Sequence, residues 1–178
     1  LVFSLHDTFI SADTAVFAAN GVDGARCRPC ELQGEMMKII IIGEGKLGFH
    51  LAENLSREDN DVTIIDKNPE ALRKADGRLD VMCIKGNGLS TSVLLEAGVQ
   101  EADILIAATN SDEMNMVCCL TAKKLGAKHT IARIRDPEYA DELSQLKMDL
   151  DLDMVINPEQ AVAGEIARLL EFPSAANI

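Results

Sequence analysis

Short apolar runs alternate with longer amphipathic stretches from Met37 onward. The runs are rich in Ile and Val and lack an internal polar alternation, as is typical of strands buried on both faces of a parallel sheet. They predict strands at Lys38–Ile42, Val62–Asp66, Asp80–Ile84, Ile104–Ala108, Thr130–Ile134 and Met154–Ile156. The stretches between them predict helices at Lys46–Arg57, Pro69–Gly77, Ser90–Ala97, Asp112–Leu125, Pro137–Leu146 and Pro158–Leu170. This alternation predicts an α/β fold, a doubly wound, Rossmann-like parallel sheet of six strands with helices on both faces.

The first 36 residues do not follow this pattern. They contain no lysine and little periodicity, and Met36 and Met37 lead directly into the first predicted strand. We therefore interpret residues 1–36 as a tag or other non-native N-terminal extension, 37–172 as a Rossmann nucleotide-binding domain and 173–178 as a C-terminal tail. Cys27 and Cys30 form a Cys-x-x-Cys pair. No strand–helix unit surrounds it, as a redox motif requires, and no second Cys/His pair completes a zinc site.

Composition excludes two large classes of function. The chain has a net charge of −12, no tryptophan and 3% aromatic residues. Nucleic acid is therefore not an expected partner, because phosphate backbones are captured by basic surfaces and single-stranded bases by aromatic ones. No apolar run approaches the ~20 residues that span a bilayer. The N-terminus lacks the basic region of a signal peptide. We therefore expect a domain that resides in the cytosol.

Gly43-Glu44-Gly45-Lys46-Leu47-Gly48 matches the G-x-G-x-x-G pattern. The match alone is weak, but here it follows a strand and opens an amphipathic helix. Gly43 would permit the tight turn, Gly45 the approach of a diphosphate to the backbone, and Gly48 close packing of helix on strand. The N–H groups at the helix start would then face the phosphates. Lys46 could reach an anionic ligand, although a solvated lysine is the alternative.

Asp66 ends the second predicted strand, where dinucleotide-binding domains carry an acidic residue. A carboxylate there accepts the hydroxyls of an adenosine ribose and repels a 2′-phosphate, which favours NAD over NADP. Lys67 could weaken that preference. The structural alternative is that Asp66 only forms a turn with Asn68.

Two further predicted strand ends face the same crevice. Gly86-Asn87-Gly88 follows the third strand and would let an adenine ring approach the backbone, which makes Asn87 and Gly88 candidate contacts. The fourth strand is followed by Thr109-Asn110-Ser111-Asp112. This segment would contact the ligand, form the N-cap of the next helix, or do both. Arg133 and Arg135 share one face of the fifth strand. They would bind a ligand phosphate or pair with acids across a subunit contact.

The predicted helix at Asp112–Leu125 carries two apolar faces. The first, expected to cover the sheet, comprises Met114, Val117, Thr121 and Leu125. The second, expected to contact another subunit, comprises Met116, Cys119 and Leu120. A helix that is apolar on two sides is usually covered on both.

Three segments resemble one known family. They are the residues from Met37 to Gly45, from Ala107 to Asn115 and from Ile131 to Tyr139, and the chain resembles the TrkA N-terminal (RCK) domain over about Lys38 to Leu170. The resemblance implies a cytosolic regulatory subunit of Trk- or Ktr-type potassium uptake systems that binds NAD(H), or ATP and ADP. It also implies a homodimer or larger ring, and a membrane-embedded potassium-translocating subunit as partner, which would hold the protein on the inner face of the membrane.

The resemblance also places the ligand on this sequence, against the loop from Gly43 to Leu47, Asp66, Thr109-Asn110 and Arg133. The full set of expected ligand-binding residues is Gly43, Glu44, Gly45, Lys46, Leu47, Gly48, Asp66, Lys67, Asn87, Gly88, Thr109, Asn110 and Arg133. Family members usually continue into a smaller C-terminal subdomain or a second Rossmann repeat, whereas this chain ends at Ile178. Effector functions of such a subdomain are therefore not expected of these residues.

An NAD-dependent dehydrogenase is the alternative that a Rossmann loop supports equally well. Such an enzyme needs a proton-transfer group near the nicotinamide. Of three histidines, His6 lies in the N-terminal segment, His50 in the first helix, and His129 at the end of the fifth strand away from the crevice. We therefore expect a regulator without catalytic activity.

Overall fold

The computed structural model of the chain describes residues 36–136, 139 and 151–171. Its six strands form one sheet in the order β3-β2-β1-β4-β5-β6, and all neighbouring strands are parallel. The strands are β1 (Lys38–Ile42), β2 (Asp61–Asp66), β3 (Met82–Lys85), β4 (Ile104–Ala107), β5 (His129–Arg133) and β6 (Met154–Ile156). This is the strand order of a Rossmann fold, so the predicted fold class is confirmed.

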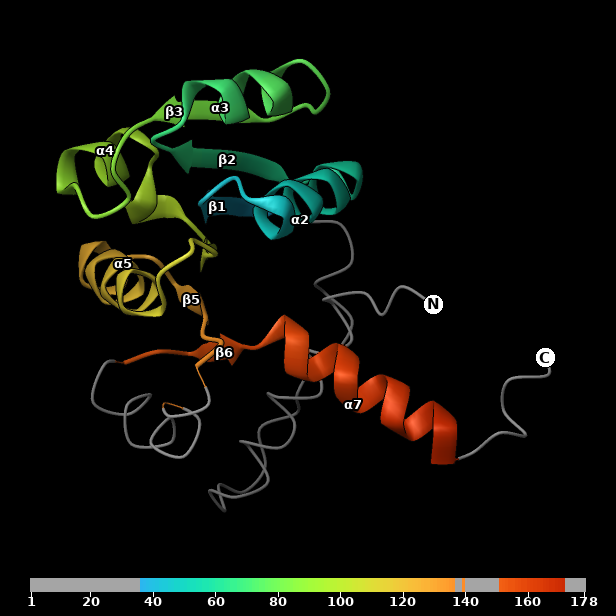
Figure 1. The fold of residues 1–178 in the computed structure, drawn as a ribbon. Helices are drawn as coiled ribbons and strands as arrows, with labels where there is room; N and C mark the ends of the chain where they lie inside the picture. Colours follow the sequence, from blue (N-terminus) through green and yellow to red (C-terminus); the bar gives the residue numbers. More distant parts are fainter. Residues whose placement is uncertain (1–35, 137–138, 140–150, 172–178) are drawn as a thin grey trace, which may run out of the picture. The chain divides into compact units, whose positions relative to one another are not determined.

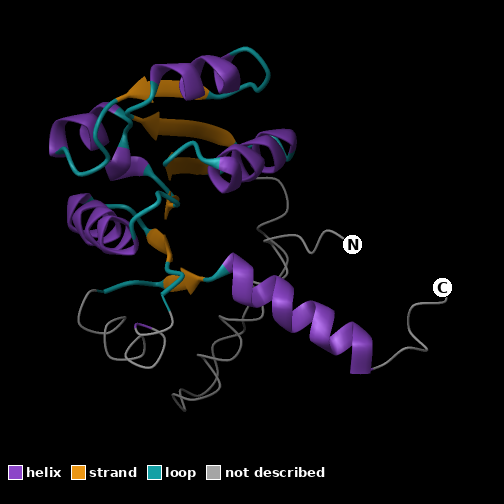
Figure 2. Cartoon of the chain, viewed as in Figure 1, coloured by secondary structure: helices purple, strands orange, loops and turns teal. Residues whose placement is uncertain are grey.

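Helices follow β1, β2, β3, β4 and β6 in the described part of the chain (Figure 2). They are α2 (Lys46–Arg57), α3 (Pro69–Asp76), α4 (Thr91–Glu96), a single 3-10 turn η1 (Val99–Glu101), α5 (Asp112–Leu125) and α7 (Pro158–Glu171). Right-handed crossovers in this strand order direct α2 and α3 to one face and α4 and α5 to the other. Figure 1 shows α4 and α5 together, apart from α2 and α3, and α4 contacts α5. None of the helices in the described ranges is long and apolar enough to cross a bilayer.

β1 lies at the centre of the sheet and determines where the glycine loop begins. Its residues Ile39–Ile42 are at most 2% exposed. Hydrogen bonding continues past the end of the strand, since the Gly43 N–H donates to the Ile65 carbonyl at 2.8 Å and the Ala108 N–H to the Ile42 carbonyl at 2.8 Å. The first residue of the loop is therefore held between β2 and β4.

Most predicted elements agree with the structure to within two residues. β3 begins at Met82 rather than Asp80, because α3 ends in a turn whose Arg78 and Leu79 N–H groups both bond to Ala75. The predicted helix at 137–146, apart from Tyr139, and the Cys27–Cys30 pair fall outside the described residues. The interpretation of residues 1–36 and 173–178 as segments outside the domain stays a prediction.

The prediction for the two faces of α5 was correct for Met114 and Leu125, which pack against the core, and wrong for the division between the faces. The buried residues of the helix are Asp112, Asn115, Met116, Cys118, Cys119 and Ala122. Met116 and Cys119 thus belong to the inner face, whereas Val117, predicted to cover the sheet, is 48% exposed.

Asn115 explains how α5 is turned. Its side chain is fully buried, where the amide Nδ2 donates to the Arg133 carbonyl at 2.8 Å and Oδ1 accepts the Thr109 N–H at 2.9 Å. A buried amide without such bonds would be strongly destabilising. The helix is therefore oriented so that Asn115 reaches its partners, and not so that the predicted apolar stripe covers the sheet.

Candidate functional site

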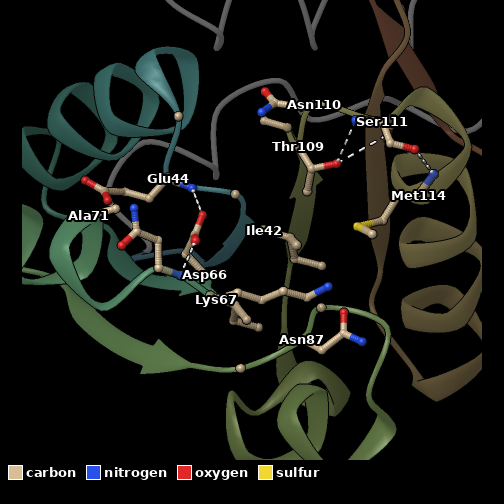
Figure 3. Close-up of a pocket in the computed structure, with 17 residues that line it drawn as sticks. Ile42, Glu44, Asp66, Lys67, Ala71, Asn87, Thr109, Asn110, Ser111 and Met114 are labelled. Carbon is tan, nitrogen blue, oxygen red and sulfur yellow. Dashed lines mark hydrogen bonds between the residues drawn. The ribbon is translucent and has the colours of Figure 1, made fainter.

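A pocket of about 430 Å³ opens at the carboxyl ends of the strands, where β1 and β4 lie side by side (Figure 3). This is the point at which the strand order reverses, because β2 and β3 follow β1 on one side and β4 to β6 lie on the other. Ligands of open α/β sheets bind at such a position. The pocket is lined by Ile42, Gly43, Glu44, Gly45, Ile65, Asp66, Lys67, Asn68, Ala71, Gly86, Asn87, Gly88, Ala108, Thr109, Asn110, Ser111 and Met114.

Each glycine of the loop meets a different constraint. Gly43 has φ +97°, a conformation that favours glycine. A Cβ atom on Gly48 would lie 1.9 Å from the Gly43 carbonyl oxygen, so only glycine permits this approach of α2 to the loop. At Gly45 nothing lies within 4 Å of the Cβ position, and this residue is the N-cap of α2 without a side-chain cap. Gly45 therefore leaves the backbone at the helix start open to the pocket.

Asp66 at the end of β2 is fixed by backbone donors. Its Oδ2 accepts the Glu44 N–H and its Oδ1 accepts the Asn68 N–H, both at 2.7 Å (Figure 3). Asn68 in turn caps α3 by accepting the Glu70 N–H at 3.0 Å. The carboxylate thus joins the glycine loop to the start of α3, and each of its oxygens retains a lone pair for a further donor.

Glu44 is the unusual acidic residue of this pocket. It is only 8% exposed, and its Oε2 is buried without a hydrogen-bond partner among the described residues. Burial raises the pKa of the Glu44 carboxyl, and the nearby charge of Asp66 raises it further, whereas Lys74 on α3 acts in the opposite direction. The pattern of the sequence does not reveal this burial, since a glutamate in a loop is normally solvated.

The end of β4 supplies a hydrogen-bonded corner beside the pocket. The Thr109 hydroxyl donates to Asn115 Oδ1 at 2.6 Å, and the Ser111 hydroxyl caps α5 by accepting the Met114 N–H at 3.1 Å. Thr109 and Asn110 line the pocket, so this segment is both a helix cap and part of the pocket wall. At the end of β3, a Cβ atom on Gly88 would lie 2.3 Å from an Ile42 methyl group. A side chain at this position would therefore require Ile42 to move.

Most of the predicted ligand-binding residues meet in this pocket: Gly43, Glu44, Gly45, Asp66, Lys67, Asn87, Gly88, Thr109 and Asn110. Figure 3 shows the Lys67 side chain extending into it. Lys46, Leu47 and Gly48 lie in the first turn of α2 and do not line it. The prediction did not include the apolar wall, which comprises Ile42, Ile65, Ala71, Ala108 and Met114. These residues sit at strand ends and in first helical turns, a placement that could have identified them.

Arg133 and Arg135 stand beside the pocket and do not line it. The Arg133 guanidinium pairs with Glu159 on α7 at 2.7 Å, its side chain is 13% exposed, and its Nε is buried without a partner in the described part. Arg135 donates to the Asn110 carbonyl and lies 3.6 Å from an oxygen of Asp112. Arg135 therefore joins the pocket residue Asn110 to the chain after β5, and Arg133 joins β5 to α7.

The model of the TrkA-N domain family matches residues 39–158, a range that includes the whole pocket. The chain belongs to the TrkA-N domain family. Among curated relatives, the Trk system potassium uptake protein TrkA of Vibrio alginolyticus is 43% identical over 145 residues, 80% of this chain and 32% of that protein. The trkA homolog 1 of Methanosarcina mazei is 45% identical over 146 residues, 78% of this chain and 35% of that protein. This chain thus spans about a third of the length of these relatives.

Solved structures share the fold of this TrkA-N domain. The RCK domain of GsuK superposes with a TM-score of 0.61 at 26% identity, covering 78% of this chain and 29% of that one. The GsuK channel bound to NAD gives a TM-score of 0.57 at 19% identity, covering 85% and 27%. The family resemblance in the sequence is therefore confirmed.

Proposed function

We propose that this TrkA-N domain is a nucleotide-sensing regulatory part of a potassium uptake system. In this proposal NAD(H) binds the pocket, with ATP and ADP as the other candidate ligands, and the bound nucleotide changes how a membrane-embedded potassium-translocating subunit opens. The domain works on the cytoplasmic side of the membrane as a homodimer or larger ring. The curated relatives, which are named potassium uptake proteins, support this reading, and the GsuK structure with NAD makes NAD the first ligand to test.

The observation that carries the proposal is the arrangement of the glycine loop and Asp66 around one pocket. The open position at Gly45 gives a diphosphate access to the start of α2, and Asp66 is held at the neighbouring strand end. The ribose of a nucleotide lies between these two groups in a Rossmann fold. In the proposal the diphosphate contacts Gly43 to Leu47, the ribose Asp66, and the base the chain near Asn87 and Gly88, with Lys67 beside it. Thr109 and Asn110 then face the second half of a dinucleotide.

Arg133 contacts the ligand in this proposal only if its ion pair with Glu159 opens. The pair is short and one partner is largely buried, so opening has an energetic cost that a ligand phosphate would have to offset. A triphosphate can reach farther than a dinucleotide diphosphate, and Arg133 is therefore assigned to ATP-type ligands.

We predict that Asp66→Ala weakens NADH binding by about 1–3 kcal/mol, the scale for losing a hydrogen bond to a charged group. Calorimetric titration of the purified protein with NADH, NAD⁺, ATP and ADP measures this and ranks the four ligands. Asp61→Ala, at the opposite end of β2, removes the same charge and should leave the affinities unchanged. Equal dissociation constants for wild type and Asp66→Ala, with melting temperatures preserved, would remove Asp66 from the site.

A dehydrogenase remains the alternative class, and the pocket wall argues against it. The described residues that line the pocket include neither histidine nor cysteine, and its carboxylates, Asp66 and Glu44, lie at the proposed ribose end. We predict that the protein binds NADH without oxidising it in the presence of simple aldehydes and ketones. Sustained turnover that Gly45→Asp abolishes would favour an enzyme instead.

A further inference from the structure

Glu44 brings into the pocket a carboxyl group whose Oε2 has no hydrogen-bond partner among the described residues. The residue is 8% exposed, lines the pocket, and has a buried Oε2 that accepts no hydrogen bond from the described residues. Figure 3 shows the side chain pointing towards Ala71 on α3. A buried carboxylate oxygen is almost always hydrogen-bonded, so its ionised form is poorly stabilised here.

The groups around Glu44 come from three elements. Asp66 from β2 repels the negative charge of Glu44, and Lys74 from α3 attracts it. Cys83 on β3 is the third neighbour: burial raises the pKa of its thiol, and the charges of Asp76 and Glu44 raise it further. Lys67 is the basic residue that lines the pocket. Two carboxylates thus face a site with one lining lysine, although that site is proposed to receive a diphosphate.

Asp66 and Glu44 differ in how well their charges are held. Both oxygens of Asp66 accept backbone N–H groups at 2.7 Å, whereas no donor in the described part of the chain reaches Glu44 Oε2. A bound diphosphate adds negative charge beside both carboxylates and so favours protonation of one of them. The proton binds to the carboxylate whose ionised form is stabilised by fewer hydrogen bonds. That carboxylate is Glu44.

We infer that Glu44 takes up a proton when the pocket binds an anionic nucleotide, which makes this domain a sensor whose affinity depends on pH. The inference rests on the proposed function of the pocket. Protonation removes the charge from a carboxyl group whose buried Oε2 has no hydrogen-bond partner among the described residues.

The sign of the effect follows from linkage. The complex holds more protons than the free protein wherever Glu44 is ionised without ligand and protonated with it. Affinity therefore rises as the pH falls, by at most about tenfold per pH unit for one proton.

NAD⁺ is the suitable probe, because its diphosphate keeps a constant charge from about pH 6 to about pH 8, the range in which proton-linked regulation operates in cells. Calorimetry at one pH in two buffers of different ionisation enthalpy gives the protons taken up per NAD⁺ bound. For the wild type we expect uptake and an affinity that increases towards acid pH. Glu44→Gln should show no uptake and a flat pH profile. It should also bind NAD⁺ about threefold or more tightly at about pH 8, where wild-type Glu44 repels the ligand.

Glu58→Gln is the matched control, because it makes the same charge change at the exposed far end of α2 and should keep the wild-type pH profile. Uptake that persists in Glu44→Gln, or a wild type that binds NAD⁺ without uptake, overturns the role of Glu44 and leaves the proposed function standing. A wild type that binds none of the four nucleotides at any pH overturns both. Even if Glu44→Gln fails to fold, a wild type that binds NAD⁺ without proton uptake overturns the role of Glu44.

Discussion

Gly48→Ala is expected to destabilise the domain by about 3 kcal/mol or more. The added Cβ would lie 1.9 Å from the Gly43 carbonyl oxygen and 3.0 Å from the Gly43 carbonyl carbon. Both atoms belong to the backbone, and the Gly43 N–H is hydrogen-bonded to the Ile65 carbonyl of β2. Relieving the clash would therefore require a backbone shift that is energetically costly. Overpacking of this kind usually costs about 1–3 kcal/mol, and more where rigid backbone meets rigid backbone. Urea denaturation followed by circular dichroism measures the loss.

Gly45→Ala provides the matched control in the same loop. Nothing lies within 4 Å of its Cβ position and its φ is −71°, so the methyl group meets no obstacle. The free energy of unfolding should fall by less than about 1 kcal/mol, the cost of alanine as a poor N-cap. Nucleotide affinity should fall clearly, because the methyl group occupies the space that a diphosphate needs. Equal free energies of unfolding for Gly48→Ala and Gly45→Ala would contradict the inference that α2 approaches the loop too closely for a side chain at residue 48.

The glycine loop was predictable from sequence because each of its constraints is local. Strand β1 reads as an apolar run, the glycines follow at fixed spacing, and Asp66 closes the next strand, so the loop and its acidic partner could be placed before the fold was known. Parallel strand order then brought the ends of β3 and β4 to the same pocket, as predicted for Asn87 and Thr109.

Features that depend on distant parts of the chain were not predictable in the same way. Arg133 was expected at the ligand, but Glu159 lies at the start of α7, and no local pattern reports an ion pair between residues that far apart. The burial of Glu44 is a tertiary feature, since its side chain points towards Ala71 on α3. The orientation of α5 depends on Asn115, which a count of apolar positions passes over. In each case a polar side chain finds its partner, or lacks one, through tertiary contacts.

Asn115→Leu is expected to lower the free energy of unfolding by about 2–5 kcal/mol. The native amide uses its full bonding capacity, with Oδ1 accepting the N–H and the hydroxyl of Thr109, and Nδ2 donating to the carbonyls of Thr109 and Arg133. Leucine fills a similar volume and leaves the Thr109 N–H and the Arg133 carbonyl without partners, each at about 1–3 kcal/mol.

The same substitution should also weaken nucleotide binding, because Asn115 ties the pocket residue Thr109 to β5. Asn115 is fully buried and does not line the pocket, so any loss of affinity must act through the position of Thr109 and its neighbour Asn110. Lys124→Ala, an exposed change on the same helix, should alter the free energy of unfolding by no more than about 0.5 kcal/mol and leave affinity intact. Urea denaturation and calorimetric titration on the two variants separate these outcomes. A stable Asn115→Leu with wild-type affinity would mean that α5 is held against the sheet by its apolar contacts alone, and that the polar corner at Thr109 contributes nothing to the site.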